Sequence, residues 1–239
     1  MTKAARVRSV ARWTAAASGL AAATYGVCVA AAWLRYGRAS SAGAGEEDEL
    51  LDRFMPVFEV AERHHIAVAA PASITFAAAA EMDLNRSLPV RLIFRAREQA
   101  MRGSSRPLPS GGLLQLVQGL GWGVLAERPG QEIVMGAVTQ PWLADVVFRP
   151  LPPERFARFD EPGYVKIAWT LRADPVGDAR SVFRTETRVV ACDPGARTKF
   201  RRYWSFVSPG IVLIRWLMLR PVKVQAETRV RRLPQTSVT

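Results

Sequence analysis

Cysteine and histidine are scarce in this chain, and their scarcity excludes several kinds of site. The 239 residues include two cysteines, Cys28 and Cys192, and two histidines, His64 and His65. Two distant thiols cannot make a disulfide-rich fold, and neighbouring histidines on a strand point to opposite faces, which is the wrong geometry for a metal pair. The sequence also lacks a phosphate-binding glycine loop and a Gly-x-Ser-x-Gly nucleophile motif. We therefore expect no disulfide, no metal ion and no cofactor.

Acidic residues are also in the minority. The chain has 21 Asp and Glu against 33 Lys and Arg, of which four are lysine, and its net charge is +12. A basic surface favours anionic partners such as phospholipid head groups or nucleic acid. Because 49% of the residues are apolar, the chain can bury a sizeable core, which excludes a disordered or collagen-like protein. The length suits one domain of roughly 150–200 residues with a smaller additional segment.

Charge is absent from one long stretch near the amino terminus. The 22 residues from Trp13 to Leu34 carry none, and as a helix they extend about 33 Å, enough to cross a bilayer. A tryptophan stands near each end, where membrane interfaces favour aromatic rings, and Arg12 and Arg35 lie immediately outside. We expect a retained single-pass anchor. Two other interpretations stay open, since nine of the 22 residues are alanine: a cleaved signal peptide and a buried helix of a soluble protein.

Basic residues on the two sides of this stretch predict its orientation. Four precede it and two follow it before an acidic cluster, which favours a cytosolic amino terminus with the rest of the chain outside. This topology suits a bacterial inner membrane. Small residues also recur at fourfold spacing, as in Ala15, Gly19 and Ala23, so two such helices can pack closely. A homodimer through the anchor is therefore a further expectation.

The composition divides the chain into segments. Ala39–Gly45 consists of small residues that cannot pack, and four acidic residues follow it, so we expect a flexible linker there. The expected order is a basic tail at 1–12, the anchor at 13–34, the linker at 35–58, one folded domain at 59–233 and a carboxy-terminal tail at 234–239.

Within the domain, the hydrophobic periodicity predicts strands and helices. The first strand covers Glu62–Ala70, and two helices follow over Ala72–Leu84 and from Ser87 toward Met101. Next come the proline- and glycine-rich loop Gly103–Gly112 and an apolar turn around Leu113–Leu120. Five more strands are expected, at Trp122–Arg128, Glu132–Gln140, Asp145–Arg149, Tyr164–Ala173 and Arg180–Cys192.

One long helix is expected at the carboxy terminus. Asp193 is a good capping residue and Pro194 suits the first helical position, so the helix should begin there. Apolar residues then recur on one face as far as Met218. Pro209 should kink the helix, and Pro221 should kink it again or end it.

This order of elements resembles a known superfamily. Glu62–Pro71 is similar to an opening strand that ends in Ala-Pro before a helix, and Phe183–Val189 is similar to a last strand. Both resemble the START/polyketide-cyclase-like (SRPBCC) superfamily, over roughly Glu62–Val230. The resemblance implies an α+β helix-grip fold, in which a curved antiparallel sheet of about six to seven strands wraps around the long carboxy-terminal helix. It also implies an apolar cavity between sheet and helix, which would hold a hydrophobic small molecule or lipid.

Strand alternation indicates which side chains face that cavity. Trp169 shares its face with other apolar residues of its strand, and Phe183, Thr185, Thr187 and Val189 form the inward row of the last strand. The candidate ligand-binding residues are Trp122, Trp142, Trp169, Phe183, Thr185, Thr187, Tyr203 and Trp204. The same residues would serve equally well as a filled core.

The same alternation leaves the enzymatic alternative without a site. An inward-facing ionisable pair would indicate a cyclase or dehydratase, as the resemblance implies for part of the superfamily, and alternation reveals none, because Glu186 faces outward. We therefore expect a non-enzymatic binding protein with no catalytic residue. A cyclase-like enzyme and a structural domain with a filled cavity are the alternatives.

The last helix is strongly basic. Ten Lys and Arg lie between Arg197 and Arg232, against the single acid Glu227. Such a helix would be drawn to an anionic membrane surface, or would be a solvated face in an arginine-rich protein. Nucleic acid is not expected, because no aromatic residues alternate with exposed arginines on a predicted sheet.

Overall fold

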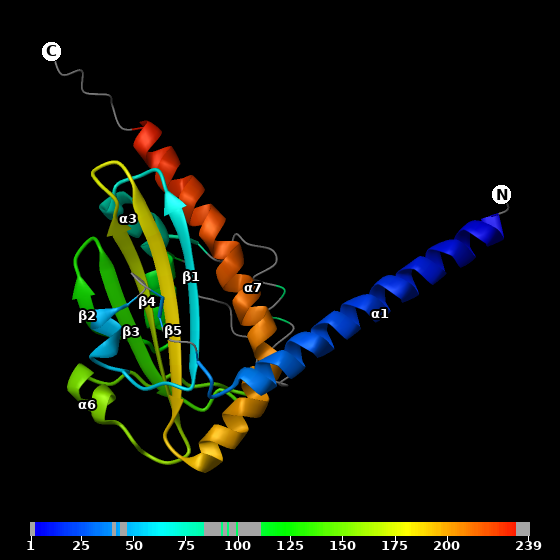
Figure 1. Cartoon of the computed structure of the whole chain (residues 1–239), viewed down its shortest axis with the longest axis horizontal. Helices are drawn as coiled ribbons and strands as arrows, with labels where there is room; N and C mark the ends of the chain where they lie inside the picture. The colour runs from blue at the N-terminus through cyan, green and yellow to red at the C-terminus, as the bar shows by residue number, and fades with distance from the viewer. Residues whose placement is uncertain are drawn as a thin grey trace.

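The computed structural model describes residues 3–39, 42–43, 47–83 and 111–232, with the single positions 92, 95 and 99. Most of the expected helix from Ser87 toward Met101 and of the loop Gly103–Gly112 therefore lies outside the described residues, as does part of Ala39–Gly45. The elements, shown in Figure 1, are α1 (Lys3–Arg35), α2 (Glu49–Asp52), β1 (Val60–Val68), α3 (Ala72–Ala80), α5 (Leu113–Gly119), β2 (Gly123–Arg128), β3 (Glu132–Thr139), α6 (Pro153–Arg158), β4 (Val165–Pro175), β5 (Ser181–Ala191) and α7 (Pro194–Arg232).

The described strands form one antiparallel sheet in the order β1-β5-β4-β3-β2. The first strand pairs with the last, from Val60 opposite Val189 to Val68 opposite Ser181, so β1 is an edge strand. The sheet has five strands within the described residues, and the six counted from the sequence were wrong by one. Asp145–Arg149 contributes only an isolated bridge between Val138 and Arg149. Pro141 and Pro150 flank that segment, and proline cannot donate to a strand ladder.

α7 begins where the sequence predicted. The amides of Gly195 and Ala196 donate to the Asp193 carboxylate at 2.7 and 3.0 Å. The helix is 39 residues long and passes through both prolines, so Pro221 does not end it. Figure 1 shows α7 changing direction where α1 crosses it. Pro209 explains this bend, because it has no amide hydrogen for the carbonyl one turn earlier.

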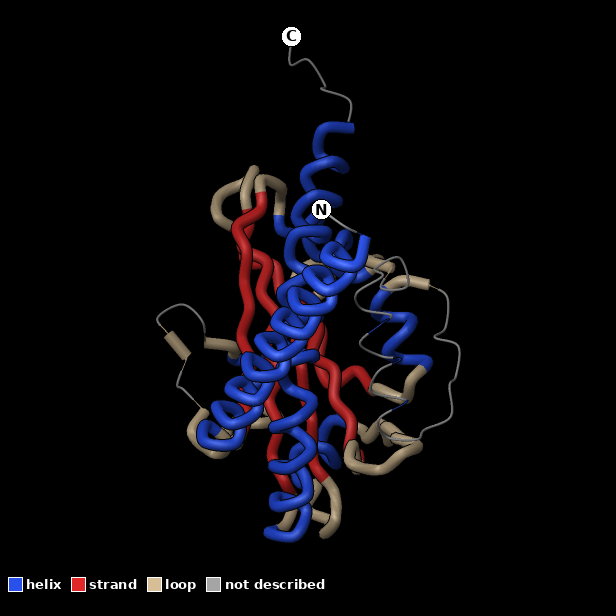
Figure 2. Tube along the Cα trace, turned by 90° about the vertical axis from the view of Figure 1, so that its right-hand side faces the viewer, coloured by secondary structure: helices blue, strands red, loops and turns tan. Residues whose placement is uncertain are grey.

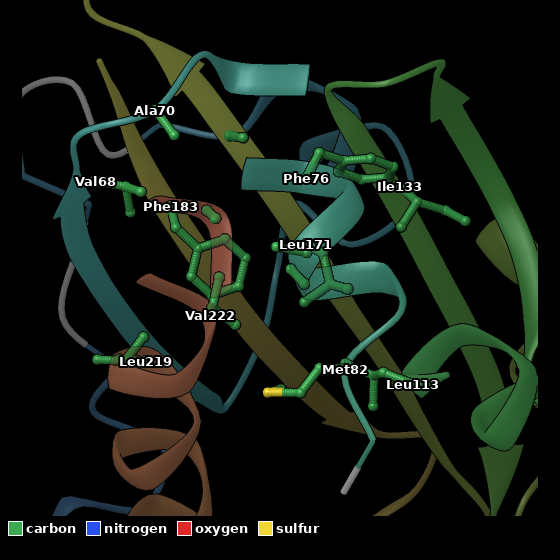
Figure 3. Packing of buried hydrophobic residues seen from close by; sticks show 14 of the residues in the cluster. Val68, Ala70, Phe76, Met82, Leu113, Ile133, Leu171, Phe183, Leu219 and Val222 are labelled. Atoms are coloured by element: carbon green, nitrogen blue, oxygen red, sulfur yellow. The ribbon is translucent and has the colours of Figure 1, made fainter. Parts of the chain in front are cut away.

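The main core lies between the sheet and α7. Figure 3 shows Phe183 and Leu171 of the sheet packed with Leu219 and Val222 of α7, while α3 and α5 close the far side. Burial of these apolar side chains holds the helix against the sheet. The expected α+β helix-grip architecture is therefore confirmed: a curved antiparallel sheet with a long carboxy-terminal helix across it.

A second core covers the opposite face of the sheet. Leu51 and Met55, which follow the acidic cluster, are buried there with Phe156 of α6 and with Val134 and Val138 of β3. The expected linker at 35–58 included these two residues, whereas the structure packs them against the domain. α2 is capped by Asp48, whose carboxylate accepts the Leu51 amide at 2.8 Å.

The end of α1 is firmly docked on the domain. Tyr36 is buried and its hydroxyl donates to Glu59 at 2.5 Å, while Arg201 of α7 donates to the Trp33 carbonyl at 2.9 Å. Figure 2 shows α1 crossing α7 on the side away from the sheet. Farther from this junction the side chains are exposed, 71% for Leu20 and 69% for Val27. Beyond the junction, the described side chains of α1 are therefore not buried within this chain.

The long carboxy-terminal helix is a candidate membrane span by its length and composition. Among the residues whose side chains are described, α7 is long and apolar enough to cross a bilayer. The sequence analysis expected the apolar span near the amino terminus, at Trp13–Leu34. Residues 3–12, 14, 15 and 17 of α1 have no described side chains, so the comparison of the two helices is confined to the remainder.

Candidate functional site

A cleft of about 680 Å³ opens at the β1 edge of the sheet, between α1, β1 and α7. Its volume falls within the range that small-molecule sites occupy. The helical walls are largely apolar, and the side along β1 is polar. The lining residues are Cys28, Ala31, Ala32, Arg35, Tyr36, Arg38 and Ala39 from α1 and its end, Glu59, Val60, Ala61, Glu62, Arg63 and His65 from β1 and its start, and Trp204, Ser208, Pro209 and Val212 from α7.

Glu59 is already engaged by the fold. Its carboxylate accepts the Tyr36 hydroxyl at 2.5 Å and pairs with Arg197 at 3.0 Å. Burial raises the pKa of Tyr36 well above its ordinary value, and the hydrogen bond to Glu59 adds to the effect. Glu59 therefore joins the end of α1 to the domain. Glu62 is the other carboxylate of the cleft, and it has no hydrogen bond to the described part of the chain.

Glu62 lines the cleft and is also close enough to Arg215 of α7 to be affected by its charge. Burial raises the pKa of Glu62, and the positive charges of Arg215 and Arg35 oppose this rise. Arg215 points from α7 toward the sheet and donates to the Thr185 hydroxyl at 2.8 Å. At neutral pH this guanidinium keeps its positive charge, and it attracts the Glu62 carboxylate.

His64 lies next to Glu62 on the same face of β1. Its Nε2 atom is 4.0 Å from Glu62 Oε2 and has no hydrogen-bond partner among the described residues. Burial lowers the pKa of His64, so the imidazole is neutral at pH 7. The Thr187 hydroxyl is likewise buried without a partner in the described part of the chain. β1 and β5 place Glu62 opposite Thr187 and His64 opposite Thr185.

These five residues, Glu62, His64, Thr185, Thr187 and Arg215, are called the inner polar cluster below. A buried polar atom without a hydrogen bond costs free energy, so a cluster that contains two such atoms favours a bound polar group. The cluster combines a carboxylate, a neutral imidazole, two hydroxyls and a guanidinium. It can therefore bind a hydroxyl or carbonyl group of a guest by donating and accepting hydrogen bonds.

The eight residues expected to bind ligand are divided among three places. Thr185 and Thr187 belong to the inner polar cluster, as their inward parity predicted. Trp122, Trp169 and Phe183 pack in the main core, with the two indole rings 6.1 Å apart. The other three, Trp142, Tyr203 and Trp204, pack around Phe200 near the start of α7. Trp204 also lines the cleft. Ligand contact by any of the eight remains a prediction.

Sequence reasoning missed Glu62, His64 and Arg215. Alternation placed His64 and His65 on opposite faces of the first strand. Glu62 has the same parity as His64, but the sequence analysis did not connect the two residues. Arg215 was counted with the basic residues of the last helix. The conclusion that the inner face carries no ionisable pair was therefore wrong. No sequence signal distinguishes Arg215 from the other arginines of α7, because its inward position depends on how the helix packs.

The basic residues of α7 do not form one free surface. Arg197 pairs with Glu59, and Arg229 pairs with Glu81 at 2.7 Å. Lys223 pairs with Glu227 at 2.8 Å and also donates to the Ala67 carbonyl. With Arg201 bound to α1, Arg215 turned inward, Arg231 bonded to Thr228 and Lys199 over the Trp142 ring, seven of the ten basic residues make contacts within the chain. Attraction of the whole helix to an anionic surface remains a prediction.

Comparisons with known proteins give structural matches only. No family model matches the sequence, and no curated protein matches it. Among solved structures, the chain is similar to CalU16 from Micromonospora echinospora, with 13% identity over 72% of this chain and 86% of that one, at a TM-score of 0.25. It is also similar to the Zhui aromatase/cyclase from a Streptomyces species, with 15% identity over 72% and 96% of the two chains, at a TM-score of 0.25.

A third match is norcoclaurine synthase from Thalictrum flavum, with 10% identity over 72% of this chain and 87% of that one, at a TM-score of 0.25. At TM-scores of 0.25 and identities of 10–15%, these matches carry no argument about the function of this chain. The function must therefore be argued from the cleft and the inner polar cluster.

Proposed function

We propose that this helix-grip chain is a membrane-anchored protein that binds a hydrophobic small molecule or lipid in the cleft between α1, β1 and α7. The observation that carries the proposal is the cleft itself, which has largely apolar helical walls and Glu62 on its polar side. An amphipathic guest would place its apolar part against Ala32 and Val212 and direct its polar group toward Glu62. Removal of apolar area from water would drive binding, at roughly 25 cal/mol per Å².

The exposed apolar surface of α1 supports the anchoring part of the proposal. Leu20, Val27 and Leu34 are all more than 60% exposed, at 71%, 69% and 64%. A row of such side chains on a long helix is unfavourable in water and favourable in lipid. Because the end of α1 is docked on α7, an anchored α1 would hold the cleft at a fixed place relative to the bilayer.

Solvent extraction of the purified full chain tests the binding. Mass spectrometry of the extract should detect a co-purifying apolar molecule, and Ala32→Phe, which fills the cleft, should reduce its amount at least tenfold. Ala23→Phe is the matched control, because Ala23 lies on the same helix but is exposed and does not line the cleft. An extract with no apolar molecule beyond the detergent, or equal amounts from the two variants, would favour a structural domain and contradict the proposal.

A second candidate function rests on the inner polar cluster. The raised pKa of Glu62 and the lowered pKa of His64 bring the two values closer together, which suits one group to donate a proton and the other to accept one. Such a pair could serve a cyclase- or dehydratase-like reaction on a guest that reaches past Glu62, which lines the cleft, to His64. His64 Nε2 and Glu62 Oε2 are 4.0 Å apart, so both could contact one polar group of such a guest from the same side.

The two functions predict different extracts from a Glu62→Gln variant. An enzyme would hold its product in the wild type and its unconverted substrate in the variant, so the two molecules would differ in mass or in chromatographic retention. A binding protein would hold the same molecule in both. Glu227→Gln serves as the control, since Glu227 bonds the Ala69 amide and Lys223 and does not line the cleft.

A further inference from the structure

The outer face of α7 carries a row of uncovered apolar side chains. Phe206, Leu213 and Trp216 are 61%, 46% and 66% exposed, although the opposite face of the helix packs on the sheet. The spacings of seven and three residues place all three on one side of the helix. A core helix of a soluble protein is mostly covered, whereas only 22% of the apolar window of α7 is buried within the described molecule.

Positive charge lies at both ends of this row. Arg202 precedes Phe206 by one turn and Arg220 follows Trp216 by one turn, and both are exposed on the same side. The two arginines are about 27 Å apart along the helix. An apolar strip that contains Phe and Trp and is bordered by arginines matches the boundary between acyl chains and anionic head groups.

Two hydrogen bonds between α1 and α7 fix the position of this row of side chains relative to α1. The Tyr25 hydroxyl donates to the Phe206 carbonyl at 2.5 Å, and Arg201 donates to the Trp33 carbonyl at 2.9 Å. Tyr25 lies nine residues before Leu34, which corresponds to about 14 Å along the helix. If Trp13–Leu34 enters the bilayer, Phe206 cannot stay outside it, because it is bonded to a residue of that segment. The long side chains of Arg202 and Arg220 then extend from the two ends of the row toward the head groups. Figure 2 shows α1 leaving from the side of α7 that faces away from the sheet.

We infer that the outer face of α7, from Phe206 to Trp216, is embedded in the same leaflet through which α1 enters the membrane, with Arg202 and Arg220 among anionic head groups. This inference rests on the proposed anchoring by α1 and adds a second membrane contact to it. The cleft then opens beside the lipid, because Cys28 and Ala31 of α1 and Pro209 and Val212 of α7 form its walls. A lipid reaches the cleft laterally, without crossing water.

Fluorescence quenching by lipids measures this contact. The full chain, with its free thiols replaced in a Cys28→Ser, Cys192→Ser background, carries an environment-sensitive dye on a new cysteine, Leu213→Cys. It is reconstituted in vesicles of phosphatidylcholine and phosphatidylglycerol that contain a doxyl lipid quencher near the head group. Val176→Cys, in the turn between β4 and β5, is the matched control, because its exposure of 45% equals that of Leu213 within one per cent. Leu20→Cys reports on α1.

The result expected is at least threefold stronger quenching at Leu213 than at Val176, with a weaker difference when Arg202→Glu and Arg220→Glu are added. Equal quenching at Leu213 and Val176, with strong quenching at Leu20, would overturn the inference and leave the anchor standing. Strong quenching at Leu213 without quenching at Leu20 would support the α7 contact and contradict the anchor. Absence of quenching at both positions would overturn both.

Discussion

The guanidinium of Arg215 is turned toward the sheet, whereas Arg202 and Arg220 of the same helix are exposed. Arg215→Met keeps the length of the side chain and removes the charge, so Glu62 loses a nearby positive charge and the Thr185 hydroxyl loses a donor. We expect a destabilisation of about 1–3 kcal/mol at pH 8, since a buried hydroxyl is left without its charged donor. The loss should shrink as the pH falls, because the raised pKa of Glu62 makes it protonate at a higher pH than an ordinary glutamate.

Thermal or denaturant unfolding of the full chain in detergent measures this effect. Arg202→Met is the control, and its effect should stay within about 0.5 kcal/mol. An equal effect of the two substitutions, or a loss at Arg215 that does not vary with pH, would show that Arg215 has no charged partner inside the fold.

Glu132 predicts a pH dependence of stability on the other face of the sheet. Burial raises the pKa of Glu132 from 4.5 to about 7, and the neighbouring Asp48 carboxylate adds to this. Between those two pH values the folded chain keeps a proton that the unfolded chain has released, so stability falls as pH rises from 4.5 to 7. The loss, at most about 3 kcal/mol, is complete above pH 7.

Glu132→Gln should remove this loss, because the amide is neutral at every pH. The variant is expected to be more stable than the wild type at pH 8 and to show a flatter stability profile between pH 5 and pH 8. Glu127→Gln, at an exposed position of the adjacent strand β2, should follow the wild type. A Glu132→Gln variant that is less stable than the wild type at pH 8 would indicate that the bond from Arg128, at 3.1 Å, outweighs the burial of the charge.

At the scale of elements, the sequence predicted most of the sheet and failed where segments are short. Alternation located β1, β3, β4 and β5, each at least eight residues long, and also β2, whose six residues match the strand expected at Trp122–Arg128. α2 is four residues long, too short for a helical period, and its acidic capping residues were taken as part of a linker. α6 begins at Pro153 within a proline-rich stretch that gives no helical pattern.

Packing of α2 makes a direct prediction about the domain boundary. Leu51 is fully buried against the outer face of the sheet, so Leu51→Ala should destabilise the chain by about 2–4 kcal/mol. Val57→Ala, a few residues later, removes a side chain that is 75% exposed and should have almost no effect. Denaturant unfolding compares the two variants. Equal stability of both would mean that the domain folds without α2 and that the linker extends to residue 58.

At the scale of the whole molecule, the candidate site lies where separate segments meet. The sequence predicted the inward parity of Thr185 and Thr187, since alternation along one strand is local information. It did not predict that α1 docks on α7 or that Arg215 approaches Glu62, because these contacts join residues more than 150 positions apart. The cleft depends on both contacts. A site at the edge of β1 therefore replaces the cavity expected between sheet and helix as the best candidate.

Photolabelling tests the location of the guest most directly. A phospholipid analogue with a diazirine at the end of its acyl chain is incorporated into vesicles with the full chain and activated by light, and labelled peptides are identified by mass spectrometry. The account predicts label on Cys28–Ala32 of α1 and on Pro209–Val212 of α7, and loss of the α7 label in Ala32→Phe. Label spread evenly along the exposed face of α1, with none at Pro209–Val212 and no change in Ala32→Phe, would show that lipid surrounds the anchor but does not enter the cleft.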